Sequence, residues 1–269
     1  MDFALGPKAT AAGTRLEAFE SIGSTNAEAL IRARAGERGP LWLVTAQQTA
    51  GRGRRDRAWQ SPRGNLAASI VEVMDVAPAV AATLGFAAGV ALEKALQAVS
   101  VEARLRAGGA DTTHFELKWP NDVLAGGRKL SGILLEAEPV GAQLAVVVGI
   151  GVNVVGAPDA TIFPATSLHD LGIHIGAAEL FAALADEWSQ LRAQWDDGRG
   201  FEAIRRLWLE RASGLGGEVS VRLSGTTVTG TFDTIDETGC LIVQTAAGAR
   251  VPIAAGDVYF GAAASAGTN

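Results

Sequence analysis

The feature that most constrains the fold is a change of pattern at "SGLGG", residues 213–217. Upstream of it, apolar strand-like runs are mixed with long helical patterns. Downstream, five short runs rich in Val, Thr and Ile alternate with polar residues and are separated by turns that contain Gly. Such a pattern is typical of a small β-barrel with a core of its own. We therefore predict three parts: an N-terminal segment 1–14, a large domain 15–215 and a C-terminal barrel 216–269.

The large domain is predicted to contain both strands and helices. Apolar or alternating runs predict strands at 14–21, 41–48, 65–73, 115–119, 130–138 and 143–154. Helical patterns predict helices over 25–35, from Pro78 onward, over 177–196 and over 199–212. The first of these helices is expected to begin with a capping box formed by Thr25 and Glu28.

Composition narrows the classes of function. The chain has 269 residues, is 48% hydrophobic and carries a net charge of −6. A packed core is therefore expected, and general nucleic-acid binding, which needs a basic face, is not. Cys240 is the only cysteine, and the first ten residues lack the pattern of a secretory signal, so we expect a cytoplasmic protein. The apolar run 76–92 is shorter than the roughly 20 residues of a membrane span, and we predict a buried helix there.

Positive charge is concentrated in "GRGRRDRAW", residues 51–59, where four arginines fall within six residues. If this segment is extended, Arg52 and Arg54 share one face, and Arg55 and Arg57 share the other. The two glycines allow the backbone to approach a ligand closely. A bound carboxylate or phosphate would relieve the repulsion between the arginines. A solvated basic turn and a nucleic-acid contact are the alternatives that charge alone leaves open.

A second charged segment is "KWPNDVLAGGRKLSG", residues 118–132. It places Lys118 at the end of a strand, a turn at Asn121 and Asp122, and Lys129 just before the next strand. We expect the two lysines at the same end of two neighbouring strands, where they could hold a phosphate. An ordinary hairpin with surface lysines is the alternative.

Two weaker segments place polar groups beside apolar strands. In "GIGVNV", residues 149–154, the glycines favour close approach of a ligand or of another backbone, and Asn153 adds an amide to an apolar run. In "GSTNAEA", the polar residues Ser24, Thr25 and Asn26 either cap a helix or line a polar pocket.

Residues typical of metal or nucleophile chemistry are scarce. The three histidines show no metal-ligand spacing, and no GxSxG motif is present. Handling of a phosphate would therefore rest on Arg, Lys and backbone amides, and any Mg²⁺ is expected to arrive with a nucleotide.

Together, "STN", "QTAGRGRRDRAW", "KWPNDVLAGGRKLSGILLE", "VVGIGVNV" and "FPATSL" follow one another as they do in biotin–protein ligases. The chain resembles that family over about residues 15–212. The resemblance implies an α+β fold, with a mixed β-sheet catalytic domain flanked by helices and a small C-terminal SH3-like β-barrel. It also implies ATP-dependent activation of biotin to biotinyl-5′-AMP, followed by transfer of biotin to a lysine of a biotin carboxyl carrier protein domain. ATP with Mg²⁺ and biotin would be substrates, and no tightly bound cofactor is expected.

The resemblance also implies roles for individual residues. Three are expected to be catalytic: Lys129, Arg54 and Arg52. Biotin is expected to contact Ser24, Thr25, Asn26, Gln48, Arg52, Gly53, Arg54, Lys129, Gly132, Gly149 and Gly151, the first four of them at its ureido ring. ATP or the adenylate is expected to contact Arg54, Arg55, Arg57, Trp59, Lys118, Asn121, Asp122, Lys129 and Asn153. No residue is assigned to a metal held by the protein.

The same resemblance bears on partners and on rival functions. It begins by residue 15, so we expect no N-terminal DNA-binding domain and no repressor function. The expected partners are the carrier domain, biotin and ATP, without nucleic acid or membrane, and both a monomer and a homodimer remain open. Asp56 stands where the family often has Gly, which affects the conformation of the arginine-rich segment. Lipoate–protein ligase is the nearest rival, against which the GRGR-type loop favours biotin. A nucleic-acid-binding module is the other alternative, and the acidic balance disfavours it.

Overall fold

A seven-stranded mixed sheet forms the centre of the molecule in the computed structural model, which describes residues 2–109, 113–158 and 164–260. Its strands are β1 (Arg15–Phe19), β2 (Leu41–Thr45), β3 (Leu66–Met74), β4 (Phe115–Lys118), β5 (Asp122–Ala125), β6 (Arg128–Val140) and β7 (Gln143–Val152). They lie in the order β1-β2-β3-β7-β6-β5-β4. β1 and β2 are parallel and all other neighbours are antiparallel, so the expected mixed sheet is confirmed.

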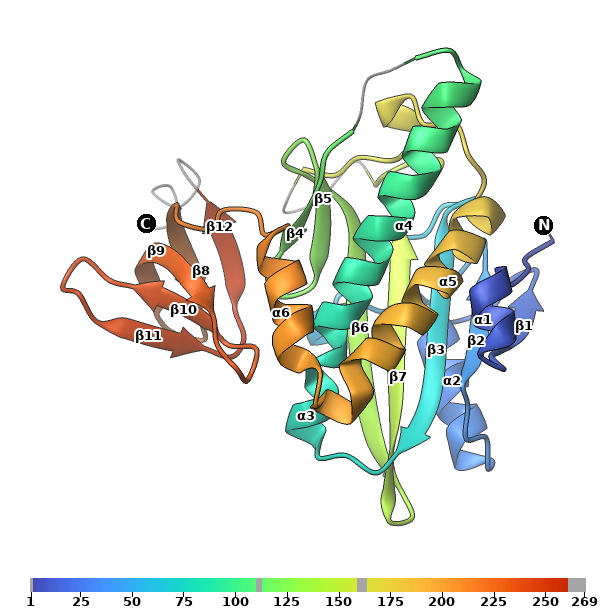
Figure 1. Cartoon of the computed structure of the whole chain (residues 1–269), viewed down its shortest axis with the longest axis horizontal. Coiled ribbons are helices and arrows are strands. Elements are labelled where there is room, and N and C mark those ends of the chain that lie inside the picture. Colours follow the sequence, from blue (N-terminus) through green and yellow to red (C-terminus); the bar gives the residue numbers. More distant parts are fainter. Residues whose placement is uncertain (1, 110–112, 159–163, 261–269) are drawn as a thin grey trace.

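Helices cover both faces of this sheet (Figure 1). The helices of the large domain are α1 (Pro7–Ala11), α2 (Thr25–Arg34), α3 (Pro78–Ala82), α4 (Leu84–Arg106), α5 (Ala177–Trp195) and α6 (Phe201–Leu209). α2 packs on one face, whereas α4 and α5 cross the other. The strand β2 is buried along its whole length for this reason. Leu41 and Leu43 join the cluster under α2, whereas Trp42 packs edge-on against Phe181 and Trp188 of α5.

The apolar segment that begins at Pro78 is a core element. By length and composition, residues 78–106 could cross a membrane, but 67% of the apolar window is buried inside the protein. Pro78 occupies the first turn of α3, and α4 follows after Thr83. The hydroxyl of Thr83 accepts a hydrogen bond from Trp195 Nε1 at 2.7 Å, which ties this break in the helix to α5. The predicted buried helix is therefore present, in two pieces.

Two details differ from the sequence-based expectation. The N-cap of α2 is Ser24, whose hydroxyl accepts from the backbone N–H of Ala27 at 3.4 Å, so the capping box centred on Thr25 is wrong. In addition, the expected turn at Asn121 and Asp122 is shorter, and the chain pairs again as β5. Turn-forming residue types suggested a loop there, but pairing with β4 and β6 on both sides stabilises an extended conformation.

The C-terminal region forms a second sheet of five antiparallel strands beside α6 (Figure 1). These are β8 (Glu218–Arg222), β9 (Thr227–Ile235), β10 (Leu241–Gln244), β11 (Arg250–Ile253) and β12 (Asp257–Phe260), in the order β11-β10-β9-β8-β12. Within the described residues 214–260, no backbone pairing joins β11 to β12, so this sheet differs from a closed barrel. Trp119 Nε1 donates to the carbonyl of Gly239 at 3.1 Å and links the two sheets. The boundaries 1–14, 15–215 and 216–269 stay a prediction.

Candidate active site

A cleft of about 300 Å³ opens between the ends of β5, β6 and β7, the arginine-rich segment, and residues 256–258 of the second sheet. Every residue that the sequence analysis assigned to biotin or ATP lines this cleft. The fold thus brings together the residues expected to bind biotin and those expected to bind ATP. The first and last of them, Ser24 and Asn153, are 129 positions apart in the sequence. Their roles toward a ligand remain predictions.

The arginine-rich segment, residues 51–59, folds as a tight loop. Gly53 N–H donates to the carbonyl of Arg57 at 2.7 Å, and Trp59 N–H donates to that of Gly51 at 2.9 Å. Between these bonds, Arg55 adopts a left-handed conformation with φ of 56°. The extended backbone assumed in the sequence analysis is therefore present at Gly53 but ends at the 3-10 turn over Arg54–Asp56. The side chain of Asp56 lies outside what the structure describes.

Three of the four arginines of this loop pair with carboxylates from distant elements. Arg52 Nη2 binds Glu136 Oε2 of β6 at 2.9 Å. Arg55 and Arg57 both bind Asp257 Oδ2 at the start of β12, at 2.8 and 3.0 Å.

Arg54 differs from the other three arginines. Its Nη1 donates to the amide oxygen of Asn121 at 3.1 Å, and among the described residues no carboxylate lies within ion-pair distance of it. Burial, and secondly the neighbouring Arg55, lower the pKa of Arg54 below its usual value. Both effects disfavour the charged form in the empty cleft, and the attraction of a bound anion would offset them. Arg54 is therefore the loop arginine best placed to receive an anion.

Two lysines also line this part of the cleft. Lys129 Nζ lies 2.6 Å from Asp122 Oδ1 and 5.7 Å from the ring centroid of Trp59. Lys118 Nζ lies 5.7 Å from the ring centroid of Phe260. Burial lowers the pKa of Lys118, and Lys129 adds to this, while Asp122 opposes it. The lysines lie on β4 and β6, which flank β5, so the expectation that their strands are neighbours is wrong, although Lys129 binds Asp122 and the charge of Asp122 also acts on Lys118.

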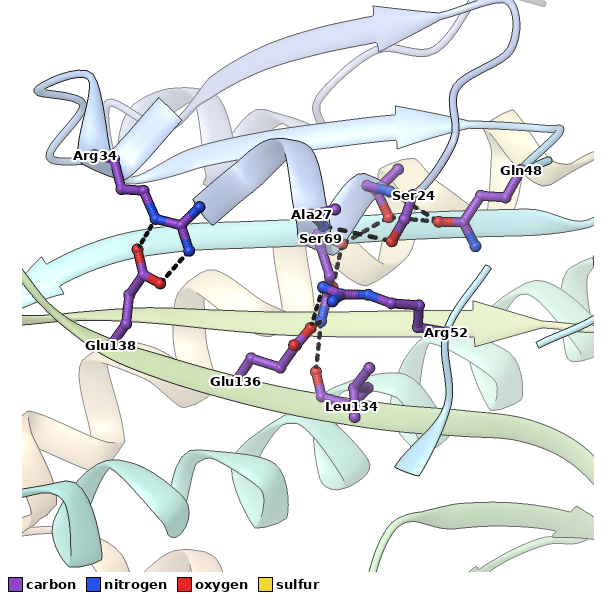
Figure 2. A network of polar contacts seen from close by, with 11 residues as sticks. Ser24, Ala27, Arg34, Gln48, Arg52, Ser69, Leu134, Glu136 and Glu138 are labelled. Carbon is purple, nitrogen blue, oxygen red and sulfur yellow. Dashed lines mark hydrogen bonds and ion pairs between the residues drawn. The ribbon is translucent and has the colours of Figure 1, made fainter. Parts of the chain in front are cut away.

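A polar network occupies the opposite end of the cleft (Figure 2). The backbone N–H of Thr25 donates to Gln48 Oε1 at 2.8 Å. Ser69 Oγ of β3 lies 2.7 Å from Thr25 Oγ1 and 2.6 Å from Asn26 Oδ1. Asn26 Nδ2 donates to Glu136 Oε2 at 2.8 Å and to the carbonyl of Leu134 at 3.2 Å. The network thus holds hydrogen-bond donors and acceptors in fixed positions, where they could bind a small polar ring.

The glycines of β7 are required by close side-chain approach. A Cβ at Gly149 would collide with the amide of Asn26, and one at Gly151 would lie 2.6 Å from Trp59 Nε1. A Cβ at Gly132 of β6 would lie 3.2 Å from the same indole. Trp59, which was expected to contact the nucleotide, therefore also lies over two glycines that were expected to contact biotin.

Asn153 presents an unused acceptor. Its Nδ2 donates to the carbonyl of Thr166 at 3.1 Å, and its side chain is 2% exposed. Its Oδ1 is buried and has no hydrogen-bond partner among the described residues. Leaving a buried acceptor unpaired is unfavourable by about 1–3 kcal/mol, so this oxygen is suited to a ligand donor such as an exocyclic amine.

Sequence reasoning missed three residues of this site: Ser69, Glu136 and Asp257. Ser69 interrupts the apolar run of β3 just as Asn153 interrupts β7, and the same signal could have identified it. Glu136 and Asp257 lie 84 and 200 residues from their arginine partners, and no local pattern indicates such pairs. The described residues contain no group of three or more His, Cys, Asp or Glu that could hold a metal ion. The carboxylates that line the cleft there are Asp122 and Asp257.

Comparison with known proteins gives a consistent result. The model of the biotin/lipoate A/B protein ligase family matches residues 18–153, and that of the biotin protein ligase C-terminal domain matches residues 214–261. Two curated relatives are named biotin--[acetyl-CoA-carboxylase] ligase. The one from Paracoccus denitrificans is 41% identical over 88% of this chain and 97% of its own length, and the one from Mycobacterium tuberculosis is 36% identical over 91% and 88%.

A solved structure shows the same fold. The biotin protein ligase from Aquifex aeolicus, in complex with biotin and ATP, aligns with a TM-score of 0.73 over 92% of this chain and 99% of that chain. At 24% sequence identity, this likeness concerns the fold. On the family match and the identity of the two relatives, this chain belongs to the biotin/lipoate A/B protein ligase family.

Proposed function

We propose that the chain activates biotin with ATP to biotinyl-5′-AMP and transfers the biotinyl group to a lysine of a biotin carboxyl carrier protein domain. The observation that carries this proposal is one cleft with two chemically different ends. At one end lie the cations Arg54, Lys118 and Lys129, of which Lys129 pairs with Asp122. At the other end, a fixed polar network faces an uncharged strand floor.

The first step joins two anions. A carboxylate oxygen of biotin attacks the α-phosphorus of ATP, the bond from that phosphorus to the bridging oxygen breaks, and pyrophosphate leaves. Repulsion between the carboxylate and the phosphate opposes the approach, and charge accumulates on the transferring group. Arg54 and Lys129 would oppose both effects because preorganised cations stabilise such charge more strongly in a partly dry cleft than in water.

The second step moves the acyl group to nitrogen. The ε-amine of the carrier lysine attacks the biotinyl carbonyl, the bond from carbon to the phosphate oxygen breaks, AMP leaves, and the amine loses a proton. The described residues of the cleft need supply no nucleophile for either step. This agrees with a lining rich in Arg, Lys and amides.

Each end of the cleft would bind a different part of the intermediate. Ser24, Thr25 and Gln48 would contact the ureido ring, and Asn153 would accept a hydrogen bond from adenine. Trp59, which lies over Gly132 and Gly151, would cover the junction between the two parts.

The surroundings of the reaction follow from the same proposal. Mg²⁺ would arrive with ATP and screen its phosphates, with Asp122 as the nearest carboxylate to the expected phosphate position. The relatives are named as acetyl-CoA-carboxylase ligases, so the carrier domain of a biotin-dependent carboxylase is the proposed acceptor. We propose that the enzyme acts in the cytoplasm.

The test is ATP–pyrophosphate exchange with purified protein, first with biotin and then with lipoate. Exchange with biotin alone, followed by streptavidin-detectable labelling of a carrier domain, is expected. Lys129→Ala should lower the exchange by about 10²–10³-fold, the usual effect of removing one preorganised donor. Lys94→Ala is the matched control because Lys94 lies on α4 and pairs with Glu187 outside the cleft. Exchange that requires lipoate instead of biotin would contradict the proposal.

A further inference from the structure

Among the side chains that the structure describes, Glu136 is the one carboxylate that touches both the arginine-rich loop and the polar network. Its Oε2 accepts from Arg52 Nη2 at 2.9 Å and from Asn26 Nδ2 at 2.8 Å (Figure 2). It stands on β6 and is not among the described residues that line the cleft. Any effect of Glu136 on a ligand must therefore act through the residues that it holds.

The Glu136 carboxylate favours one donor–acceptor direction for the hydrogen bonds that run from Asn26 through Ser69 to Thr25. Both acceptors of the Asn26 amide nitrogen, Glu136 and the carbonyl of Leu134, are unable to donate. The Asn26 oxygen must then face Ser69, and the 2.6 Å contact between them requires the Ser69 hydroxyl to donate. With its single proton used, Ser69 can only accept at its 2.7 Å contact with Thr25, so the one proton of the Thr25 hydroxyl is shared between Ser69 Oγ and Gln48 Oε1, which lies 3.1 Å away.

The direction of the chain reaches the cleft at Gln48. Its Oε1 accepts from the backbone N–H of Thr25 at 2.8 Å and lies 3.1 Å from the Thr25 hydroxyl, the last group of the chain, so its amide nitrogen is left for a ligand. A cyclic urea offers one carbonyl acceptor and two N–H donors, and it fits only a pocket whose donors and acceptors point in one fixed pattern. Without an acceptor-only group at position 136, only the longer hydrogen bond to the carbonyl of Leu134 would hold the Asn26 amide, and with it both hydroxyls, in this direction.

We propose that Glu136 is a positioning residue that sets the donor–acceptor pattern of the ureido end and so determines specificity for a cyclic urea. The inference rests on the proposed function, because it takes biotin as the substrate. Glu136→Gln keeps the shape of the side chain but adds a donor, which weakens the preference of the chain of hydrogen bonds for one direction and leaves the carbonyl of Leu134 as the only acceptor that still favours it. The affinity for biotin should fall about tenfold, whereas the discrimination against 2-iminobiotin, in which an imino group replaces the urea carbonyl, should shrink.

The chain offers a matched control two residues along the same strand. Glu138 lies on the same face of β6 and binds Arg34 Nε and Nη2 at 2.7 and 2.5 Å, away from the cleft (Figure 2). The exposed fractions of the two carboxyl side chains, 26% for Glu136 and 22% for Glu138, are similar. A general effect of losing a charge on β6 should therefore appear equally in Glu138→Gln.

The experiment measures the dissociation constants of biotin and 2-iminobiotin by calorimetry, together with KM and kcat for pyrophosphate exchange. For Glu136→Gln we expect a tenfold higher biotin constant, kcat within threefold of wild type, an unchanged KM for ATP, and a biotin to 2-iminobiotin ratio closer to one. Glu138→Gln should match wild type in all four. Ser69→Ala, which breaks the same chain without removing a charge, should give the same pattern. When Ser69→Ala is combined with Glu136→Gln, the loss of biotin affinity should be smaller than the sum of the two separate losses.

The outcomes separate this inference from the proposed function. Exchange by the wild-type protein with biotin tests the function alone. If that exchange is present and Glu136→Gln behaves like Glu138→Gln, the positioning role is wrong while the function stands. If Glu136→Gln does not fold, Ser69→Ala decides: an unchanged selectivity between the two ligands overturns the proposal.

Discussion

Arg54→Met should separate catalysis from stability. Methionine keeps an unbranched stem of similar length and removes only the charged, donating end. Because Arg54 has no carboxylate partner among the described residues, its charge is available to the ligand, and its removal should lower adenylate formation by about 10²–10³-fold, equivalent to about 2.7–4 kcal/mol. This is the cost expected for one preorganised donor.

The same substitution should leave the free energy of unfolding almost unchanged. Burial lowers the pKa of Arg54, which means that the empty fold disfavours its charge, and methionine relieves that penalty. Against this, the amide oxygen of Asn121 loses a donor, which costs about 0.5–1.5 kcal/mol. The two effects oppose each other, so we expect only a small change in Tm. An ordinary arginine in a structural ion pair would show the reverse pattern.

The assay combines pyrophosphate exchange at saturating biotin with thermal unfolding of the same preparations. Arg63→Met is the control, because Arg63 is an exposed arginine near the loop that does not line the cleft. Labelling of a bystander protein by released biotinyl-5′-AMP should rise per adenylate formed. Exchange by Arg54→Met within threefold of wild type would refute the reasoning, and so would a loss of stability as large as the loss of activity.

Three further predictions concern separate parts of the cleft. Burial lowers the pKa of Lys118, so the adenylation rate should fall as the pH rises through a value below the usual 10.5, and Lys118→Arg, which keeps its charge, should remove that fall in a pH–rate profile. Asn153→Leu should raise the KM for ATP about tenfold and leave the calorimetric affinity for biotin unchanged, because only the nucleotide side loses an acceptor. Gly149→Ala should weaken the calorimetric affinity for biotin and leave the KM for ATP unchanged, since the new Cβ displaces Asn26. Equal effects on both substrates would contradict the assignment of the two ends.

Much of the fold could be predicted from the sequence because its signals are local. The buried strand β2 reads as an unbroken apolar run since helices cover both faces of the sheet. The five C-terminal strands alternate with turn residues and were found at the expected places. β5 was missed because Asn121 and Asp122 are turn formers, and the pairing on both sides that overrides this preference is a tertiary effect.

The candidate site divides in the same way. Residues that interrupt a pattern, such as glycines or an amide in an apolar strand, were expected to contact a ligand, and they do line the cleft. The conformation of the arginine-rich loop could not be predicted, because it depends on Arg55 adopting a positive φ and on carboxylates from distant elements. Charge counting indicated that this loop needs anions. It could not show that protein carboxylates already supply them for three of the four arginines.

The origin of these carboxylates gives the cleft an asymmetry that composition does not suggest. Glu136 belongs to the central sheet and holds the first arginine of the loop, next to the polar network. Asp257 belongs to the second sheet and holds Arg55 and Arg57, next to the lysines. The proposed ureido end therefore takes its carboxylate from the central sheet, whereas the proposed nucleotide end takes one from the second sheet. A displacement of the second sheet would leave two like charges of the loop unpaired and would disturb nucleotide binding before biotin binding. In the proposed function, the C-terminal sheet therefore forms one side of the nucleotide end of the cleft.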